Sequence, residues 1–367
     1  MKKLITVRQL VLILIVSLLA LKVLYLPSLL SKQIGRDAYL FVLMFLLLDF
    51  LVLIMFVYMF NKHPDLSFYD LIKNIFGTVI AKIIMFIFFA FFFIKCWGVF
   101  QSNFNYLNEN LYTNLNWLTF SLPILVAVLY MSKFGVNAAA RLAELVVPIV
   151  IFGFLLSLTV GLFRADFSFL LPIMENGFSG FSTVFQFSFW FGDYVIFIVF
   201  FGNVKQEKNQ NKKILFTILI SIVFVAFFIA VVFAVFNYNT VCHSNAISDM
   251  LQITPSASDI GSFDWVLILI WDAALFLYFT FNSLGAFYCF RQTFFKKWQL
   301  LSISLILVSI LGLNLFTNFD INTSVTIIKS YLWYFCFFAQ YILPFVIFLF
   351  SFKLKRRALN AKVCMEK

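Results

Sequence analysis

Ten predominantly apolar segments divide the chain, and most are about as long as a helix that crosses a bilayer. A spanning helix needs about 20 apolar residues. The segments lie at residues 10–30, 39–60, 79–101, 117–132, 142–163, 181–203, 214–237, 264–290, 299–316 and 329–352. Only 12% of the 367 residues are charged, which is about half the share typical of soluble domains. The sequence therefore predicts an all-α integral membrane protein with ten transmembrane helices.

The connections between these segments are short and polar, and the longest covers residues 238–263. No stretch is suited to a soluble domain, so we predict a single transmembrane domain over residues 1–367. Lysine and arginine are concentrated in cytoplasmic loops of membrane proteins. With the N-terminus inside, the predicted inner segments carry 21 of the 27 basic residues and the outer segments carry 4. This asymmetry predicts that both termini are cytoplasmic, and it explains the net charge of +11 without a nucleic-acid partner.

Ten helices with a broken first helix suggest a transporter built from inverted repeats. We predict two five-helix repeats, at about 10–163 and 181–352, in which the first and sixth helices correspond and both are broken. Pro27 interrupts the first apolar segment, and Gly192 lies next to Asp193 near the centre of the sixth. Glycine weakens a helix by about 1 kcal/mol relative to alanine, which favours a break there.

Five charged residues fall inside the predicted spans: Lys22, Asp49, Lys95, Asp193 and Asp272. Lys95 lies about 9 Å from the predicted external end of its helix, so we expect its side chain to extend to the membrane surface. The other four lie deeper, and each has two interpretations: a structural ion pair, or ligand or proton handling. We further predict that Lys22 and Asp193 face each other across a ligand cavity.

Without Lys95, three buried carboxylates accompany one lysine. The excess negative charge requires a proton or a cation. Asp49 and Asp272 are therefore candidates for proton or ion coupling.

Catalytic, metal-binding and cofactor motifs are absent from the sequence. It contains no Walker A, GxSxG or HExxH motif. The five cysteines form no CxxC pair, and the two histidines lie in loops on opposite predicted sides of the membrane. We therefore expect neither an enzyme nor a cofactor or metal site.

Several short motifs, in order and spacing, resemble one known family. They are "TVRQL" at 6–10, "LPSLL" at 26–30, "GRDAYLFVL" at 35–43, "HPDLSFYDLIKNIFG" at 63–77, "GVNAAARLAELVVP" at 135–148, "LLPIMENG" at 170–177, "FGD" at 191–193 and "IWDA" at 270–273. From about residue 4 to 352, the chain resembles the B subunits of GerA-type spore germinant receptors. These are GerAB-like spore germination proteins of the amino acid–polyamine–organocation transporter superfamily, which has the LeuT-like fold.

The resemblance implies a ligand site at the breaks in the first and sixth helices, with Ala20, Lys22, Tyr25, Gly192 and Asp193 as candidates. The family usually has a Gly-x-Gly pair ahead of the first-helix proline, and Ala20 and Lys22 occupy those positions. A lysine there either binds the ligand or closes the site.

The function that the resemblance implies is nutrient sensing in a receptor complex. The partners would be a larger A subunit, a lipoprotein C subunit, membrane lipid and a small germinant, most simply an amino acid, in the spore inner membrane. The alternatives are a free-standing proton-coupled amino acid or polyamine permease, and a structural subunit whose site Lys22 has closed. In the most specific motif, Arg141 and Glu144 are three residues apart, so we expect them to interact on one helix face.

Overall fold

The structure is a computed structural model that describes residues 5–111, 115–171, 174, 181–243, 245–252, 264–294, 299–318 and 320–352. The C-terminal tail predicted to be cytoplasmic lies outside these ranges, as does much of the 238–263 connection. The described residues are helical almost throughout, and their one β-contact is a single parallel bridge between Ile5 and Val204. The all-α prediction is therefore confirmed for the described part of the chain.

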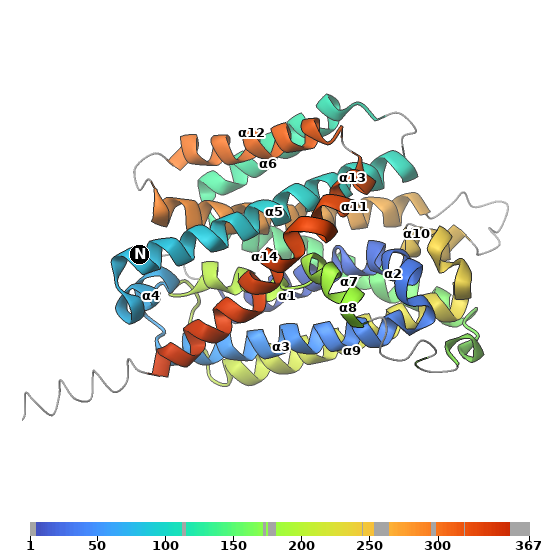
Figure 1. The fold of residues 1–367 in the computed structure, drawn as a ribbon, viewed down its shortest axis with the longest axis horizontal. Helices are drawn as coiled ribbons and strands as arrows, with labels where there is room; N and C mark the ends of the chain where they lie inside the picture. Colours follow the sequence, from blue (N-terminus) through green and yellow to red (C-terminus); the bar gives the residue numbers. More distant parts are fainter. Residues whose placement is uncertain are drawn as a thin grey trace, which may run out of the picture.

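Each of the ten predicted segments has a helical counterpart (Figure 1). In chain order these are α1 (Val7–Leu19) with α2 (Lys22–Ile34), α3 (Ala38–Lys62), α5 (Thr78–Asn110), α6 (Trp117–Phe134), α7 (Val136–Leu162), α8 (Phe181–Val184) with the 3₁₀ helices η3 (Phe185–Trp190) and η4 (Asp193–Phe200), α9 (Gln210–Phe236), α11 (Asp264–Thr293), α12 (Gln299–Phe316), and the continuous stretch Ile321–Phe352, which contains α13 (Ile321–Ile327) and α14 (Trp333–Phe337). Short helices connect them: α4 (Phe68–Phe76), α10 (Ala246–Gln252), η1 (Gly35–Asp37), η2 (Phe167–Leu170) and η5 (Asn237–Cys242).

Seven of the described helical stretches are long and apolar enough to cross a membrane. One of them, Val7–Lys62, runs for 56 residues and holds α1, α2 and α3. Phe185–Phe200 and Ile303–Phe316 are apolar but shorter. The outer helices carry highly exposed apolar side chains, such as Leu145 on α7 and Val308 on α12. This pattern is that of a multi-pass membrane protein whose outer face contacts lipid.

The first helix is interrupted at Ala20 and Leu21, between α1 and α2. Both residues keep right-handed helical backbone angles, so the interruption is a single turn and not an extended stretch. Pro27 lies inside α2 and is buried. The break therefore precedes the proline and coincides with the Ala20-x-Lys22 stretch.

The sixth helix is interrupted at Phe191 and Gly192, between η3 and η4. Phe191 is extended, and Gly192 has a left-handed backbone with φ of +79°. That conformation is accessible to glycine at little cost because it has no Cβ. A Cβ at this position would also collide with the side chain of Gln340. Gly192 is thus the residue that permits the predicted break.

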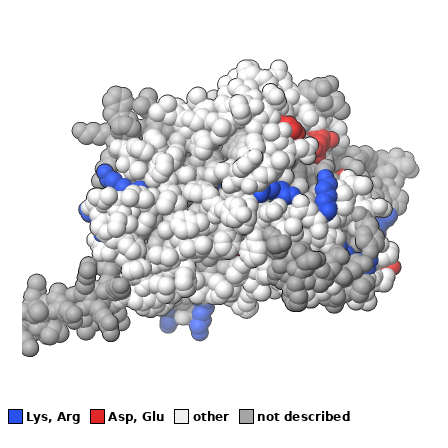
Figure 2. All heavy atoms as spheres, in the orientation of Figure 1, with Lys and Arg blue, Asp and Glu red and all other residues white. Residues whose placement is uncertain are grey.

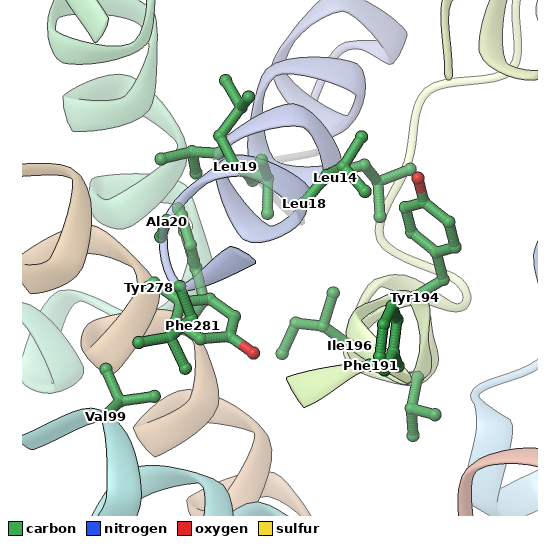
Figure 3. Close-up of a cluster of buried hydrophobic side chains, with 14 of the residues drawn as sticks. Leu14, Leu18, Leu19, Ala20, Val99, Phe191, Tyr194, Ile196, Tyr278 and Phe281 are labelled. Atoms are coloured by element: carbon green, nitrogen blue, oxygen red, sulfur yellow. The ribbon is translucent and has the colours of Figure 1, made fainter. Parts of the chain in front are cut away.

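The two broken helices lie in the interior of the bundle. α1 packs against α7, α9 and η4, while the long helices α5 and α11 run side by side, as do α3 and α9 (Figure 1). Leu14 and Leu18 of α1, Tyr194 and Ile196 of η4, and Phe281 of α11 belong to one buried cluster (Figure 3). Apolar packing therefore surrounds both breaks and keeps them away from the lipid-facing surface.

Candidate functional site

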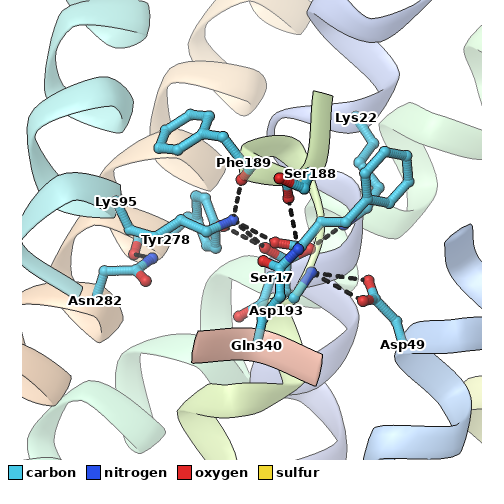
Figure 4. A network of polar contacts seen from close by, with 12 residues as sticks. Ser17, Lys22, Asp49, Lys95, Ser188, Phe189, Asp193, Tyr278, Asn282 and Gln340 are labelled. Atoms are coloured by element: carbon cyan, nitrogen blue, oxygen red, sulfur yellow. Dashed lines mark hydrogen bonds and ion pairs between the residues drawn. The ribbon is translucent and has the colours of Figure 1, made fainter. Parts of the chain in front are cut away.

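An ion pair joins the two broken helices at the centre of the molecule (Figure 4). Lys22 is the first residue of α2 and Asp193 is the first residue of η4, and their side chains are 1% and 2% exposed. Lys22 Nζ donates directly to the Asp193 carboxylate, which also accepts a hydrogen bond from the Tyr278 hydroxyl on α11. The predicted pairing is confirmed. The two side chains touch, however, so they do not face each other across a cavity in this state.

Lys95 of α5 also reaches this centre, and the prediction that it extends to the membrane surface is wrong. The residue is 1% exposed. Its Nζ donates to the backbone carbonyl of Phe189 and, at 2.6 Å, to that of Phe191, and it lies 3.5 Å from Asp193 Oδ1. The last carbonyls of a helix have no partner within the helix and carry partial negative charge. The end of η3 therefore attracts an ammonium group into the interior.

Asp49 of α3 occupies the other side of the same break. Its two carboxylate oxygens accept from the backbone N–H of Gly192 at 2.9 and 3.1 Å, and Oδ1 accepts from the Tyr341 hydroxyl at 2.8 Å. An anion is favoured at the N-terminal end of a helix, where N–H groups are unpaired. Lys95 and Asp49 thus satisfy the two ends of the interrupted sixth helix with charges of the matching sign.

The buried charges in this cluster are balanced, with Lys22 and Lys95 against Asp49 and Asp193. The predicted excess of carboxylates, counted over all the spans, left out Lys95; with Lys95 included, three carboxylates stand against two lysines and the excess is one. The excess carboxylate lies elsewhere, at Asp272, which is six residues from Tyr278 on α11, about 9 Å along the helix. Asp272 lines a separate pocket of about 580 Å³, largely walled by α6, and its Oδ1 has no hydrogen-bond partner among the described residues.

Two further candidates lie beside the ion pair without contributing a polar group to it. Ala20 is fully buried in the turn between α1 and α2. The Tyr25 hydroxyl donates to the carbonyl of Ser102 on α5 at 2.8 Å. Tyr25 therefore joins α2 to α5, and its hydroxyl does not join the Lys22–Asp193 pair.

Sequence reasoning missed the amide and hydroxyl groups that complete the network. Gln340 Nε2 donates to the carbonyl of Ser188 in η3 at 2.9 Å, and the Ser188 hydroxyl donates to the carbonyl of Trp333 at 3.0 Å. Gln340 lies in a π-helical turn, Phe338–Ile342, a geometry that is frequent at functional sites. A glutamine in the apolar stretch "FCFFAQYILPF" is a signal that could have identified it.

The predicted contact between Arg141 and Glu144 is not formed. Glu144 of α7 accepts a hydrogen bond from Gln9 Nε2 of α1 at 2.9 Å, while the Arg141 side chain is exposed. A partner on a neighbouring helix replaces the one expected on the same helix.

The site is thus a fully buried polar cluster at two facing helix breaks, inside a multi-pass helical protein. A search of curated proteins found no match to this chain. A family model described as "spore germination protein" matches residues 4–324, which is most of the length of this chain. The chain therefore belongs to the GerAB-like family of spore germination permeases.

Proposed function

We propose that the chain is the germinant-sensing membrane subunit of a spore germination receptor, and that a small ligand binds at the two helix breaks. The observation that carries this proposal is the direct Lys22–Asp193 ion pair between α2 and η4. Isolated charges inside a membrane cost several kcal/mol each and mark functional sites by default.

The fold proposed for this core is the LeuT-like arrangement of two inverted five-helix repeats, at about 10–163 and 181–352, in one domain. The interruptions in the first and sixth of the ten helical counterparts support it. In such folds, ligand sites lie near the bilayer midplane at the broken helices.

The ion pair suggests how a zwitterionic ligand such as an amino acid would bind. Its ammonium group would approach Asp193 and its carboxylate would approach Lys22, so the ligand would replace each residue's partner. The carbonyls at the end of η3 already bind Lys95, which leaves the Asp193 carboxylate as the group that receives the ligand's amine. When ligand contacts replace the contact between Lys22 and Asp193, α2 would be released from η4, and a two-state core would shift toward its open form.

The partners that we propose are a larger A subunit and a lipoprotein C subunit in the spore inner membrane, with both chain termini on the core side. Family membership and the distribution of basic residues support this assignment. Binding would act through the complex to release ions.

A proton-coupled amino acid or polyamine permease is the second candidate function. Asp272 favours it, because a buried carboxylate oxygen without a partner can take up a proton or a cation. A structural subunit with a permanently closed site is the third, since Lys22 and Asp193 touch.

Germination of a deletion strain against a panel of amino acids, sugars and salts tests the proposal. The strain should lose its response to one ligand class, and the native gene should restore that response. Uptake of the same ligand into vesicles containing the chain alone, driven by a pH gradient, would instead identify a permease. An unchanged response to every compound would contradict the sensing role.

A further inference from the structure

A second pocket lies at one end of the bundle, away from the central ion pair. Its volume is about 920 Å³, within the range typical of ligand sites. It is lined by residues of α4, the first turns of α5, the α6–α7 junction, η4 and the last turns of α11. The predicted topology places this end on the cytoplasmic side.

The pocket carries uncompensated positive charge. Lys73, Lys82 and Arg291 line it from three different helices, and Asp70 is the one acidic side chain in the lining, so the net charge is +2. All three bases are exposed, and in the described contacts none of them forms an ion pair. Asp70 instead binds the Ser67 hydroxyl at 2.5 Å. Figure 2 shows basic side chains at this end of the molecule, where α4 lies in Figure 1.

An apolar surface continues from the rim of the pocket. Phe294 lines the pocket, is 51% exposed and packs edge-to-face on Phe86 of α5, with ring centroids 5.9 Å apart. Phe86, Ile83 and Val79 are also exposed along α5. In a multi-pass membrane protein, such residues contact acyl chains. The basic pocket therefore lies where headgroups and acyl chains meet.

We propose that this pocket binds the phosphate of an anionic phospholipid, with an acyl chain along Phe86 and Phe294. Basic pockets between transmembrane helices on the cytoplasmic side are suited to anionic headgroups. A guanidinium such as that of Arg291 binds phosphate with two parallel hydrogen bonds, and the lysines add point charges. The hydroxyl groups of Thr78 and Ser132 in the lining can donate to the remaining oxygens.

Thermal unfolding of the full chain in detergent, titrated with short-chain phosphatidylglycerol, tests this site. The lipid should raise the unfolding temperature saturably, whereas phosphatidylcholine should not. Lys82→Gln and Arg291→Gln should each weaken the apparent affinity about fivefold, the equivalent of one basic residue near an anionic lipid surface. Lys212→Gln, a matched change at an exposed lysine outside the pocket, should leave the affinity unchanged.

Asp70→Asn provides a test of opposite sign. It removes the one negative charge from the lining, so phosphatidylglycerol should bind more tightly, a gain that misfolding cannot produce. If glycerol phosphate binds as tightly as phosphatidylglycerol, the pocket is a phosphate site, but the proposal that a lipid supplies the phosphate is contradicted. An equal response to phosphatidylcholine, or equal losses in Lys212→Gln and the pocket variants, would overturn the site altogether.

Discussion

Lys22 and Asp193 are each costly alone and acceptable together. A lysine at the centre of a transmembrane helix costs about 2.5–3.5 kcal/mol on insertion scales. Removing one partner of a buried pair typically costs about 3–5 kcal/mol, because the other charge is stranded. Here Tyr278 and Lys95 also contact Asp193, so the carboxylate would keep some stabilisation without Lys22.

A double-mutant cycle therefore separates structural from ligand-binding roles of the pair. Lys22→Met and Asp193→Asn should each lower the protein level or abolish the germination response, and the double variant should be milder than the sum of the singles. If the pair binds ligand, the double variant is folded but unresponsive; if it is only structural, the double variant still responds. Additive single effects would mean that the two residues do not interact functionally.

His63, directly after α3, gives the chain a measurable pH dependence. Burial, and then the neighbouring Lys62, lower the pKa of His63 from its usual 6.5. The folded state thus binds fewer protons than the unfolded state, and stability is lost as the pH falls below about 6.5. The unfolding temperature should decline between pH 7.5 and 5.5, and His63→Gln should reduce that decline. An identical pH profile in the variant would show that His63 does not contribute.

The residue scale also shows where sequence reasoning fails. The pairing of Lys22 with Asp193 was predictable, because both are deep charges on the two helices expected to be broken. Lys95 was misjudged because only its distance from the helix end was considered. Its partners are carbonyls that become free when a helix 94 residues later is interrupted. A local distance argument cannot reveal a tertiary partner of this kind.

At the scale of elements, apolar length predicted a helical counterpart for each of the ten segments, whereas the breaks depended on single residues. Gly192 marked the second break correctly because only glycine combines a positive φ with space for Gln340. Pro27 was less informative, since it lies within α2 and not at the first break. A proline inside a transmembrane helix is tolerated where neighbouring helices and side chains satisfy the backbone groups that it frees.

Gly192→Ala should disrupt the sixth helix for two separable reasons, backbone strain and the collision with Gln340. Gly77→Ala is the matched control, because Gly77 has φ of +86° but open space around its Cβ position. We expect Gly77→Ala to cost about 1 kcal/mol in unfolding free energy and Gly192→Ala clearly more. Gln340→Ala should partly rescue Gly192→Ala. Equal losses in the two glycine variants would assign the whole effect to φ alone.

At the scale of the whole molecule, the N-terminal segment is tied to the loop after η4. Ile5 exchanges backbone hydrogen bonds with Asn203 at 2.9 Å and Lys205 at 2.8 Å. The Val7 N–H donates to Glu207 at 3.4 Å. These contacts hold the outer ends of α1 and η4 together, while Lys22 and Asp193 join the breaks. A change at the ion pair therefore acts on two helices that share a second point of attachment.

The basic residues predict the orientation of this assembly, and a native cysteine can report it. Cys242 is the one exposed thiol among the cysteines that the structure describes, and it lies in the connection predicted to be external. In intact cells expressing the chain with Cys364→Ser, a membrane-impermeant maleimide should label Cys242. A cysteine introduced at Lys208, in the lysine-rich loop at 205–213, should react only after permeabilisation when combined with Cys242→Ser.

The 21-to-4 distribution of basic residues motivates this expectation. In the predicted orientation, the basic pocket and the tie between α1 and η4 lie on the cytoplasmic side. Labelling of the Lys208→Cys variant from outside would invert the molecule and move the proposed lipid site to the outer leaflet.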